Sequence, residues 1–114
     1  MKRYQGIRRR GSCSVIVLDG ERQYDLPPRT DLRPHTEGEF EWGYVGAGPR
    51  QLALALLADC TRNDELAIWR YQHFHALVVR KLSAKGGFEL AEEEIREALR
   101  QIEAGVVRAP GSGA

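Results

Sequence analysis

One unbroken apolar run constrains the fold of this chain more than any other feature. Residues 52–58 read LALALLA, and Pro49 stands three positions before them. Proline fixes φ near the helical value and has no N–H, so it suits the first turn of a helix. A helix on a protein surface carries a polar stripe, and this run has none. We therefore expect a buried central helix between a sheet and another helix, with Cys60 packed as a small apolar residue near its end.

The segment before this helix combines glycines with aromatic residues. The glycines are Gly43, Gly46 and Gly48, and the aromatic residues are Phe40, Trp42 and Tyr44. Backbone N–H groups that converge at a helix N-terminus can bind an anion, and glycine permits the close approach. The spacing fits neither a P-loop nor a dinucleotide fingerprint. We favour a structural role, in which the glycines allow sharp turns and the aromatic rings fill the core, with the anion site as the alternative.

The N-terminal quarter predicts a β-meander of about three strands. Residues 3–10 alternate weakly, residues 13–18 are apolar and β-branched, and Asp19-Gly20 is a strong hairpin signal. Residues 22–26 can return as a short strand before the next two prolines stop it.

Two further helices follow the central one. Asn63 is a good N-cap for a helix running to about Leu82. Its expected apolar face is Ala67, Tyr71, Phe74, Val78 and Leu82, widened by Trp69, Leu77 and Val79. After a glycine turn and a brief extended segment at 88–90, a helix is expected over residues 91–104, with Gly105 as its C′ residue. The sequence thus predicts an α+β fold: a small antiparallel meander packed against three α-helices in a single domain, residues 1–105, followed by a flexible tail, residues 106–114.

Composition limits the possible functions only weakly. The chain has 114 residues, 17 basic and 16 acidic, with a net charge of +1. This charge does not by itself imply nucleic acid or a membrane, and no run is long and apolar enough to span one. The first twelve residues are basic and residues 89–103 are rich in Glu, an asymmetry that can mark a binding edge or a strand edge protected by charge.

The reactive side chains form no recognisable catalytic or metal-binding motif. We interpret Cys13 and Cys60 as reduced core residues of a cytoplasmic protein. His73 and His75 point in different directions on a helix, so they cannot chelate one ion together. We expect no metal, no cofactor and no catalytic residues, and on balance no enzymatic activity. Glu37, Glu39 and Glu41 would share one face of an extended strand, most simply as a solvated acidic edge.

A set of residues spread over nearly the whole chain matches the pattern of one known family. They are Leu26–Arg29 with Asp31–Leu32, His35, Phe40–Tyr44 with Gly46, Gly48 and Pro49, Gln51–Ala55, Gln72, Phe74, Leu90 and Glu94–Ile95. In these residues the sequence resembles the DUF6166 family of uncharacterised small bacterial proteins. The resemblance implies a setting on phages, plasmids and other mobile elements, but no agreed activity. The chain departs from the family pattern at His75, Phe88 and Ala91. Ala91 replaces a capping Ser or Thr, so the last helix should lack a side-chain N-cap.

Three functions remain as expectations. The first is a non-enzymatic binding protein that inhibits or assists a host protein, through a surface formed by Arg29, Arg33, His35, Trp42 and Tyr44. The second is a nucleic-acid-binding domain that uses the basic strand residues Arg8, Arg9 and Arg10. The third is an enzyme or binder of a phosphorylated small molecule at Gly43, Gly46 and Gly48. The sequence leaves the oligomeric state open.

Overall fold

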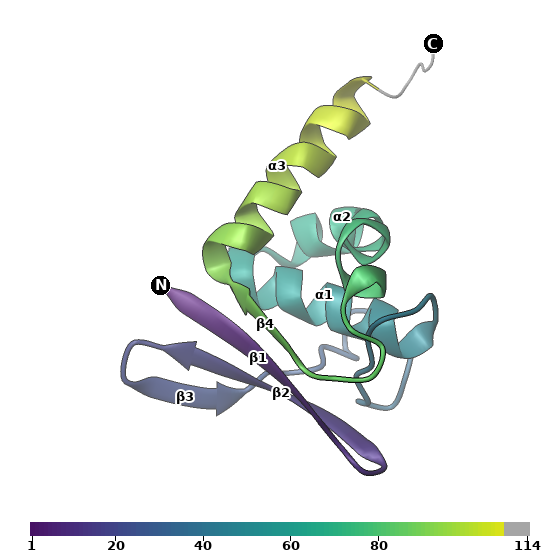
Figure 1. The fold of residues 1–114 in the computed structure, drawn as a ribbon. Helices are drawn as coiled ribbons and strands as arrows, with labels where there is room; N and C mark the ends of the chain where they lie inside the picture. Colours follow the sequence, from purple (N-terminus) through teal and green to yellow (C-terminus); the bar gives the residue numbers. More distant parts are fainter. Residues whose placement is uncertain (109–114) are drawn as a thin grey trace.

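The fold is an antiparallel sheet covered by helices, seen in a computed structural model that describes residues 1–108 (Figure 1). The α+β prediction is confirmed. The elements in chain order are β1 (Lys2–Arg9), β2 (Ser12–Asp19), β3 (Arg22–Asp25), α1 (Ala47–Thr61), α2 (Asp64–Leu77), the short 3-10 helix η1 (Val79–Lys81), β4 (Phe88–Ala91) and α3 (Glu92–Arg108).

The first three strands form the predicted meander. β1 pairs with β2 in the register Lys2↔Asp19, and β2 pairs with β3 in the register Asp19↔Arg22. Gly20 has φ 64° in the second turn, a left-handed conformation that glycine adopts at little cost. Local turn chemistry therefore sets this part of the sheet.

The sheet has four strands, where about three were predicted. β4 pairs antiparallel with β1, with Leu90 opposite Tyr4, and the strand order is β3-β2-β1-β4. The ring of Phe88 occupies the space that a Cβ at Gly6 would need, so glycine permits this close pairing. A four-residue edge strand has too little periodicity to be predicted apart from its distant partner.

The apolar helix α1 is the centre of the core, as predicted. It begins at Ala47, and residues 51–58 are all buried. Figure 1 shows α1 between the sheet and α2. Tyr4 and Val17 from the sheet and Phe74 from α2 belong to the same apolar cluster.

α2 begins as predicted but is shorter. The side chain of Asn63 accepts a hydrogen bond from the Leu66 N–H at 3.1 Å, which satisfies a free donor of the first turn. The helix ends at Leu77, and η1 follows. The prediction that Trp69 widens the buried face is wrong, since its side chain is 69% exposed. Position 69 is two residues from the buried Tyr71, a rotation of about 200° around the helix axis.

α3 packs only part of its length against the body. Ile95, Ala98 and Ile102 are buried, and beyond them the helix projects away from the domain (Figure 1). Ala91, the residue before α3, has no side-chain acceptor that could cap the helix, and Glu94 Oε1 accepts the Ala91 N–H at 2.8 Å. The helix continues past residue 105, so Gly105 is not its C′ residue. Of the expected tail, residues 106–108 belong to α3, and residues 109–114 lie outside the described residues.

None of the helices within residues 1–108 is long and apolar enough to cross a membrane.

Candidate functional site

The long connection between β3 and α1 contains most of the predicted contact residues and is fixed by one buried side chain. Gln51 of α1 is fully buried. Its Oε1 accepts the N–H groups of His35 and Thr36 at 2.8 and 3.1 Å, and its Nε2 donates to the Pro28 carbonyl at 2.6 Å. The connection is therefore held against the core although it contains no strand or helix.

Arg29 has a structural role in this connection. Its guanidinium donates two hydrogen bonds to Asp64, at 2.9 and 2.8 Å, and two to Asp31, both at 3.1 Å. The hydrogen bonds to Asp64 and Asp31 raise the pKa of Arg29, and those from Arg29 lower the pKa of both carboxyl groups. With these donors engaged, Arg29 ties the connection to the start of α2.

His35 and Arg33 differ in accessibility. His35 is half-buried, with its Nε2 2.6 Å from the hydroxyl of Tyr71, and burial lowers the pKa of its imidazole. Arg33 is exposed. Of the predicted residues Arg29, Arg33 and His35, Arg33 is therefore the one presented to solvent.

Trp42 fills the core, so it cannot be an exposed anchor. Its side chain is 0% exposed, and its Nε1 donates to the Gly86 carbonyl at 2.9 Å. Its ring packs edge-on against the ring of Phe88, with 4.8 Å between the ring centroids. Tyr44 and the neighbouring Val45 are 48% and 55% exposed. The predicted contact loop thus presents a Tyr-Val tip.

Gly43 is required by the local backbone. It has φ 91°, and its N–H donates to the Val79 carbonyl at 3.0 Å, so this N–H is not available to an anion. A Cβ at this position would lie 2.6 Å from the Cα of Ala84. Both the conformation and the contact exclude a side chain.

Gly46 and Gly48 each accommodate a protein neighbour. A Cβ at Gly46 would lie 2.7 Å from a ring carbon of Tyr44, and one at Gly48 would lie 2.7 Å from the Cβ of Glu41. All three glycines therefore have a packing reason, which supports the structural interpretation of the loop over the anion site.

Arg8 is part of the folded core of the sheet and loop. Its guanidinium donates to Glu41 at 2.7 Å and to the carbonyls of Trp42 and Gly86 at 3.3 and 3.2 Å. It also lies over the Trp42 ring, 4.8 Å from the centroid. Arg8 is thus not available to track phosphates, and the nucleic-acid candidates reduce to Arg9 and Arg10, which are exposed.

The two cysteines are in different surroundings. Cys60 is buried, which raises the pKa of its thiol to about 11. Cys13 is half-buried, and its Sγ lies 3.4 Å from Glu41 and 3.5 Å from Arg8. Burial and the carboxylate raise the pKa of Cys13, so neither thiol is activated as a nucleophile.

The predicted acidic edge does not form. Residues 36–46 contain no strand, so Glu37, Glu39 and Glu41 do not share the face of one. Glu41 instead turns to Arg8, whose guanidinium holds the pKa of this carboxyl down against the opposing effect of burial.

The two histidines of α2 lie on different sides of the helix. His73 is exposed and His75 buried, as their helical positions predicted. Within residues 1–108, no group of three or more His, Cys, Asp or Glu side chains could hold a metal ion.

The most exposed aromatic side chain lies beside a groove between α2 and α3. We call this feature the Trp69 groove, and it consists of two adjoining depressions that share Leu66 and Glu103. One is lined by Asn63, Glu65, Leu66, Trp69, Arg70 and Glu103, and the other by Leu66, Arg96, Leu99, Arg100 and Glu103. Leu66, Trp69 and Leu99 give it an apolar floor and wall.

Ion pairs fix the rim of the Trp69 groove. Arg70 donates to both carboxylate oxygens of Glu103, at 2.8 and 3.2 Å, which joins α2 to α3. Arg96 donates to Glu92 at 2.9 Å and to the Cys60 carbonyl at 2.9 Å. The apolar strip therefore lies beside the paired side chains of Arg70, Arg96 and Glu103.

Comparison with known protein families shows the family of this chain. A model described as "Family of unknown function (DUF6166)" matches residues 4–101. The chain belongs to this family. Neither the curated proteins nor the solved structures gave a match.

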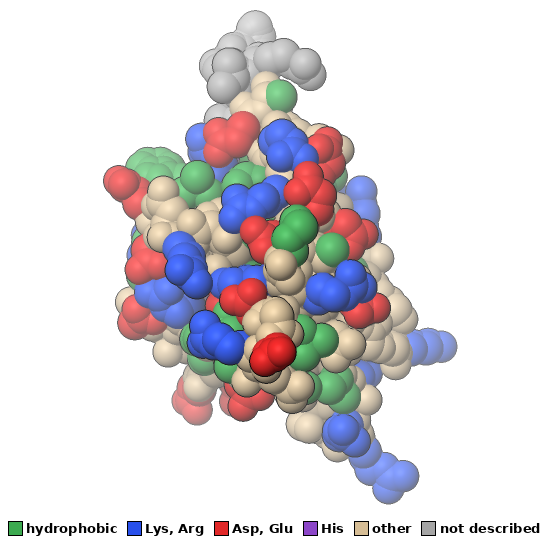
Figure 2. Space-filling view, turned by 90° about the vertical axis from the view of Figure 1, so that its left-hand side faces the viewer, with side chains coloured by type: hydrophobic (Ala, Val, Ile, Leu, Met, Phe, Trp, Pro, Cys, Tyr) green, Lys and Arg blue, Asp and Glu red, His purple; other side chains and the backbone are tan. Residues whose placement is uncertain are grey.

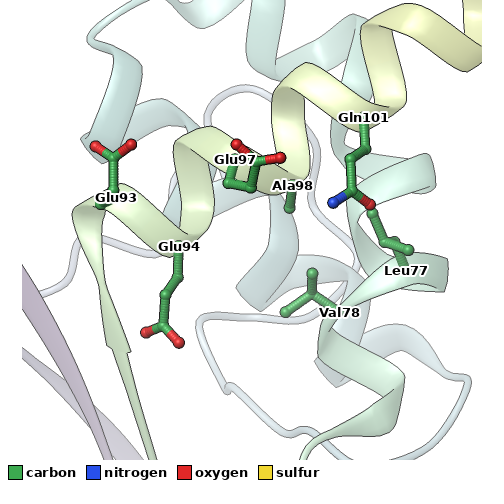
Figure 3. Close-up of a pocket in the computed structure, with 7 residues that line it drawn as sticks. All are labelled: Leu77, Val78, Glu93, Glu94, Glu97, Ala98 and Gln101. Carbon is green, nitrogen blue, oxygen red and sulfur yellow. The ribbon is translucent and has the colours of Figure 1, made fainter.

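A second groove of the DUF6166 protein lies at the end of α2. Figure 3 shows Leu77 and Val78 facing Ala98 of α3, with Glu93, Glu94, Glu97 and Gln101 along the helix. Arg100 pairs with Glu93 and Glu97 at 3.0 and 2.7 Å, and Glu94 accepts the Ala91 N–H. Its carboxylates are thus engaged within α3 and the residue before it.

Charged side chains of both signs are mixed over much of one face of the DUF6166 protein. Figure 2 shows Lys and Arg side chains interspersed with Asp and Glu over most of this face. The sequence signal for the Trp69 groove was present but assigned to the core: a Trp two positions from the buried Ala67 and Tyr71 lies on the opposite side of the helix.

Proposed function

We propose that this DUF6166 protein is a non-enzymatic binding protein whose partner is another protein, held in the Trp69 groove. The observation that carries the proposal is the 69% exposure of Trp69 beside Leu66 and Leu99. With the mobile-element setting that the family resemblance implies, the partner is a host protein that the DUF6166 protein inhibits by occupying its surface.

The energetics of an exposed indole support this use. Burial of a large apolar side chain contributes about 1.5 to 3 kcal/mol, and Trp is among the residues most enriched at the energetic centres of interfaces. The Arg70–Glu103 pair fixes the neighbouring rim before binding. Less side-chain entropy is then lost when a partner docks.

The shape and charge of the groove favour an amphipathic helix as the bound segment. The groove lies between two helices, and Arg70, Arg96 and Arg100 of its lining oppose Glu65 and Glu103, so its net charge is small. A helix of the partner with an apolar stripe would pair that stripe with Leu66, Trp69 and Leu99.

The test combines a groove variant with a matched variant at the other exposed aromatic site. Trp69→Ala should abolish capture of the host partner, and Tyr44→Ala should retain it, because only Trp69 lines the groove. The free energy of unfolding of each variant should lie within about 0.5 kcal/mol of the wild-type value, since both side chains are exposed. The measurement is pull-down with purified tagged protein, followed by titration of the recovered partner. Equal capture by wild type and the Trp69 variant would refute the groove as the binding surface.

A second candidate function is nucleic-acid binding at the turn between β1 and β2. It is favoured by the exposed pair Arg9 and Arg10. With two phosphate contacts, the logarithm of the binding constant would fall with the logarithm of the salt concentration with a slope of only about −1.8. Binding in this mode would therefore be weak. Retention on DNA or RNA at low salt, lost on Arg9→Gln with Arg10→Gln, would favour it over the protein partner.

A further inference from the structure

A polar cavity of about 430 Å³ lies at the C-terminal end of α1, and no residue that lines it also lines the Trp69 groove. Its walls come from the sheet, from the connection after β3 and from both ends of the α1–α2 link. Four basic side chains line it, together with two carboxylates: Lys2, Arg22, Arg29, Arg62, Asp59 and Asp64. The lining therefore has more positive than negative groups, in contrast to the nearly neutral chain.

Two of these cations are neutralised inside the protein. Lys2 is 8% exposed, and its Nζ pairs with Asp59 at 3.0 Å. Arg29 pairs with Asp64 at 2.8 Å and also with Asp31. These pairs form the inner wall of the cavity. The excess positive charge of the lining therefore comes from Arg22 and Arg62.

Arg22 and Arg62 are exposed, and within residues 1–108 neither makes an ion pair with a carboxylate. The Arg22 guanidinium lies over the Tyr24 ring, 4.9 Å from its centroid. The backbone of Arg62 is left-handed, with φ 56°, and its N–H donates to the Ala58 carbonyl at 2.9 Å, so the Cα of Arg62 is fixed at the end of α1. Two arginines from different elements thus line one cavity.

The carboxylates of the cavity add hydrogen-bond acceptors. Asp59 already accepts from the hydroxyls of Tyr4 and Tyr24 at 2.8 and 2.9 Å, and its side chain is 12% exposed. The Asp64 side chain is 50% exposed and turns both oxygens toward Arg29. A carboxylate oxygen has more than one lone pair, so Asp64 can accept further hydrogen bonds from a ligand hydroxyl.

We propose that this cavity binds a phosphorylated sugar, with the phosphate between Arg22 and Arg62 and the sugar hydroxyls directed to Asp64. Guanidinium groups match phosphate oxygens in bidentate geometry. A purely anionic ligand would meet the carboxylates at the inner wall, whereas a hydroxyl-bearing ligand donates to them. The cavity volume is in the lower part of the range for small-molecule sites.

Calorimetric titration tests the proposal with ribose 5-phosphate, ribose and inorganic phosphate at constant ionic strength. Ribose 5-phosphate should bind with a dissociation constant of about 0.1 to 1 mM, which corresponds to a binding free energy of about −5.5 to −4 kcal/mol. Ribose should not bind measurably, and inorganic phosphate should bind at least tenfold more weakly. Equal affinity for ribose 5-phosphate and inorganic phosphate would mean an adventitious ion only, and would overturn the proposal. No binding of ribose 5-phosphate would overturn it as well.

Matched variants locate the site. Arg22→Gln and Arg62→Gln should each reduce the affinity for ribose 5-phosphate at least tenfold, because each removes one guanidinium from the phosphate. Arg9→Gln makes the same charge change at an exposed residue outside the cavity and should leave the affinity unchanged. Thermal melts confirm that all three variants are folded. An equal loss in all three, or no loss in the two cavity variants, would contradict the assignment.

Discussion

At the residue scale, the side chain of Arg8 joins parts of the chain that are far apart in the sequence. It bonds to Glu41 and to the Trp42 carbonyl before α1, and to the Gly86 carbonyl before β4. The hydrogen bond to Glu41 raises the pKa of Arg8, so the guanidinium stays charged. One cation thus satisfies acceptors from two loops beside the buried indole of Trp42.

Replacing Arg8 should therefore destabilise the fold. Arg8→Gln should lower the free energy of unfolding by about 1 to 3 kcal/mol, because Glu41 and a carbonyl in each loop lose a charged donor. Arg9→Gln should change it by less than about 0.5 kcal/mol, since Arg9 is exposed. Urea denaturation of both variants measures the difference. Equal stability of the two would show that the contacts of Arg8 are not structural.

The roles of single residues could be predicted where they depend on local chemistry. The N-cap Asn63, the uncapped Ala91 and the opposite directions of His73 and His75 follow from helix geometry and were predicted. Arg8 could not be assigned in this way, because its partners are more than thirty residues distant. Long-range partners are fixed by the tertiary fold, which no local pattern contains.

At the element scale, the connection between β3 and α1 is tied to the core by a side chain of α1. Gln51, which directly precedes the apolar run 52–58, supplies one donor and one acceptor to three backbone groups of the connection. A buried amide is stable there because its hydrogen bonds are satisfied. The connection can thus remain irregular and still be ordered.

Gln51→Leu should release this connection. The substitution keeps the side-chain size but leaves the N–H groups of His35 and Thr36 without their acceptor. We expect a loss of about 2 to 6 kcal/mol of unfolding free energy, on the order of 1 to 3 for each of the two N–H groups left unpaired. Amide hydrogen exchange at His35 and Thr36 should accelerate more than at α2. Gln23→Leu, at an exposed position of β3, is the control, and unchanged exchange in the Gln51 variant would contradict this role.

Elements with local signals were predicted better than those that depend on distant pairing. The hairpins and α1 were recognised from turn residues and from the apolar run. β4 was seen only as a brief extended segment, because its strand character comes from pairing with β1. For the Trp69 groove, the exposure of Trp69 could be predicted from its spacing to Ala67 and Tyr71, whereas the groove itself needs both α2 and α3 to be placed.

At the scale of the whole molecule, the ionisable groups define a pH range of stability. Burial, reinforced by the nearby Arg50, lowers the pKa of His35 and of His75 below the ordinary value of 6.5. The Nε2 of His75 is buried and has no hydrogen-bond partner within the described residues. At the other limit, burial raises the pKa of Cys60 from 9.0 to about 11. The folded protein thus disfavours protonation of the imidazoles and ionisation of the thiol.

The sign of the effect follows from the number of protons that each state binds. Below pH 6.5 the unfolded chain protonates its histidines while the folded protein resists, so stability is present above pH 6.5 and is lost as pH falls toward the lower folded pKa values. Carboxyl groups with lowered pKa, such as Glu41 and Glu92, extend the loss at more acid pH. For Cys60 the loss occurs instead as pH rises from 9.0 to about 11.

The melting temperature should therefore fall when the pH is lowered from about 7.5 to about 5.5, before the carboxyl groups titrate. His75→Gln removes the buried imidazole, so it should reduce the dependence of melting temperature on pH in this interval. His73→Gln, at an exposed position of the same helix, should leave the dependence as in wild type. Differential scanning calorimetry measures the melting temperature of all three proteins at both pH values. The quantity compared is the change in melting temperature with pH, because a packing cost of the substituted amide side chain shifts the melting temperature equally at both pH values. A wild-type melting temperature that stays constant over this interval would contradict the burial of neutral imidazoles as a source of acid sensitivity.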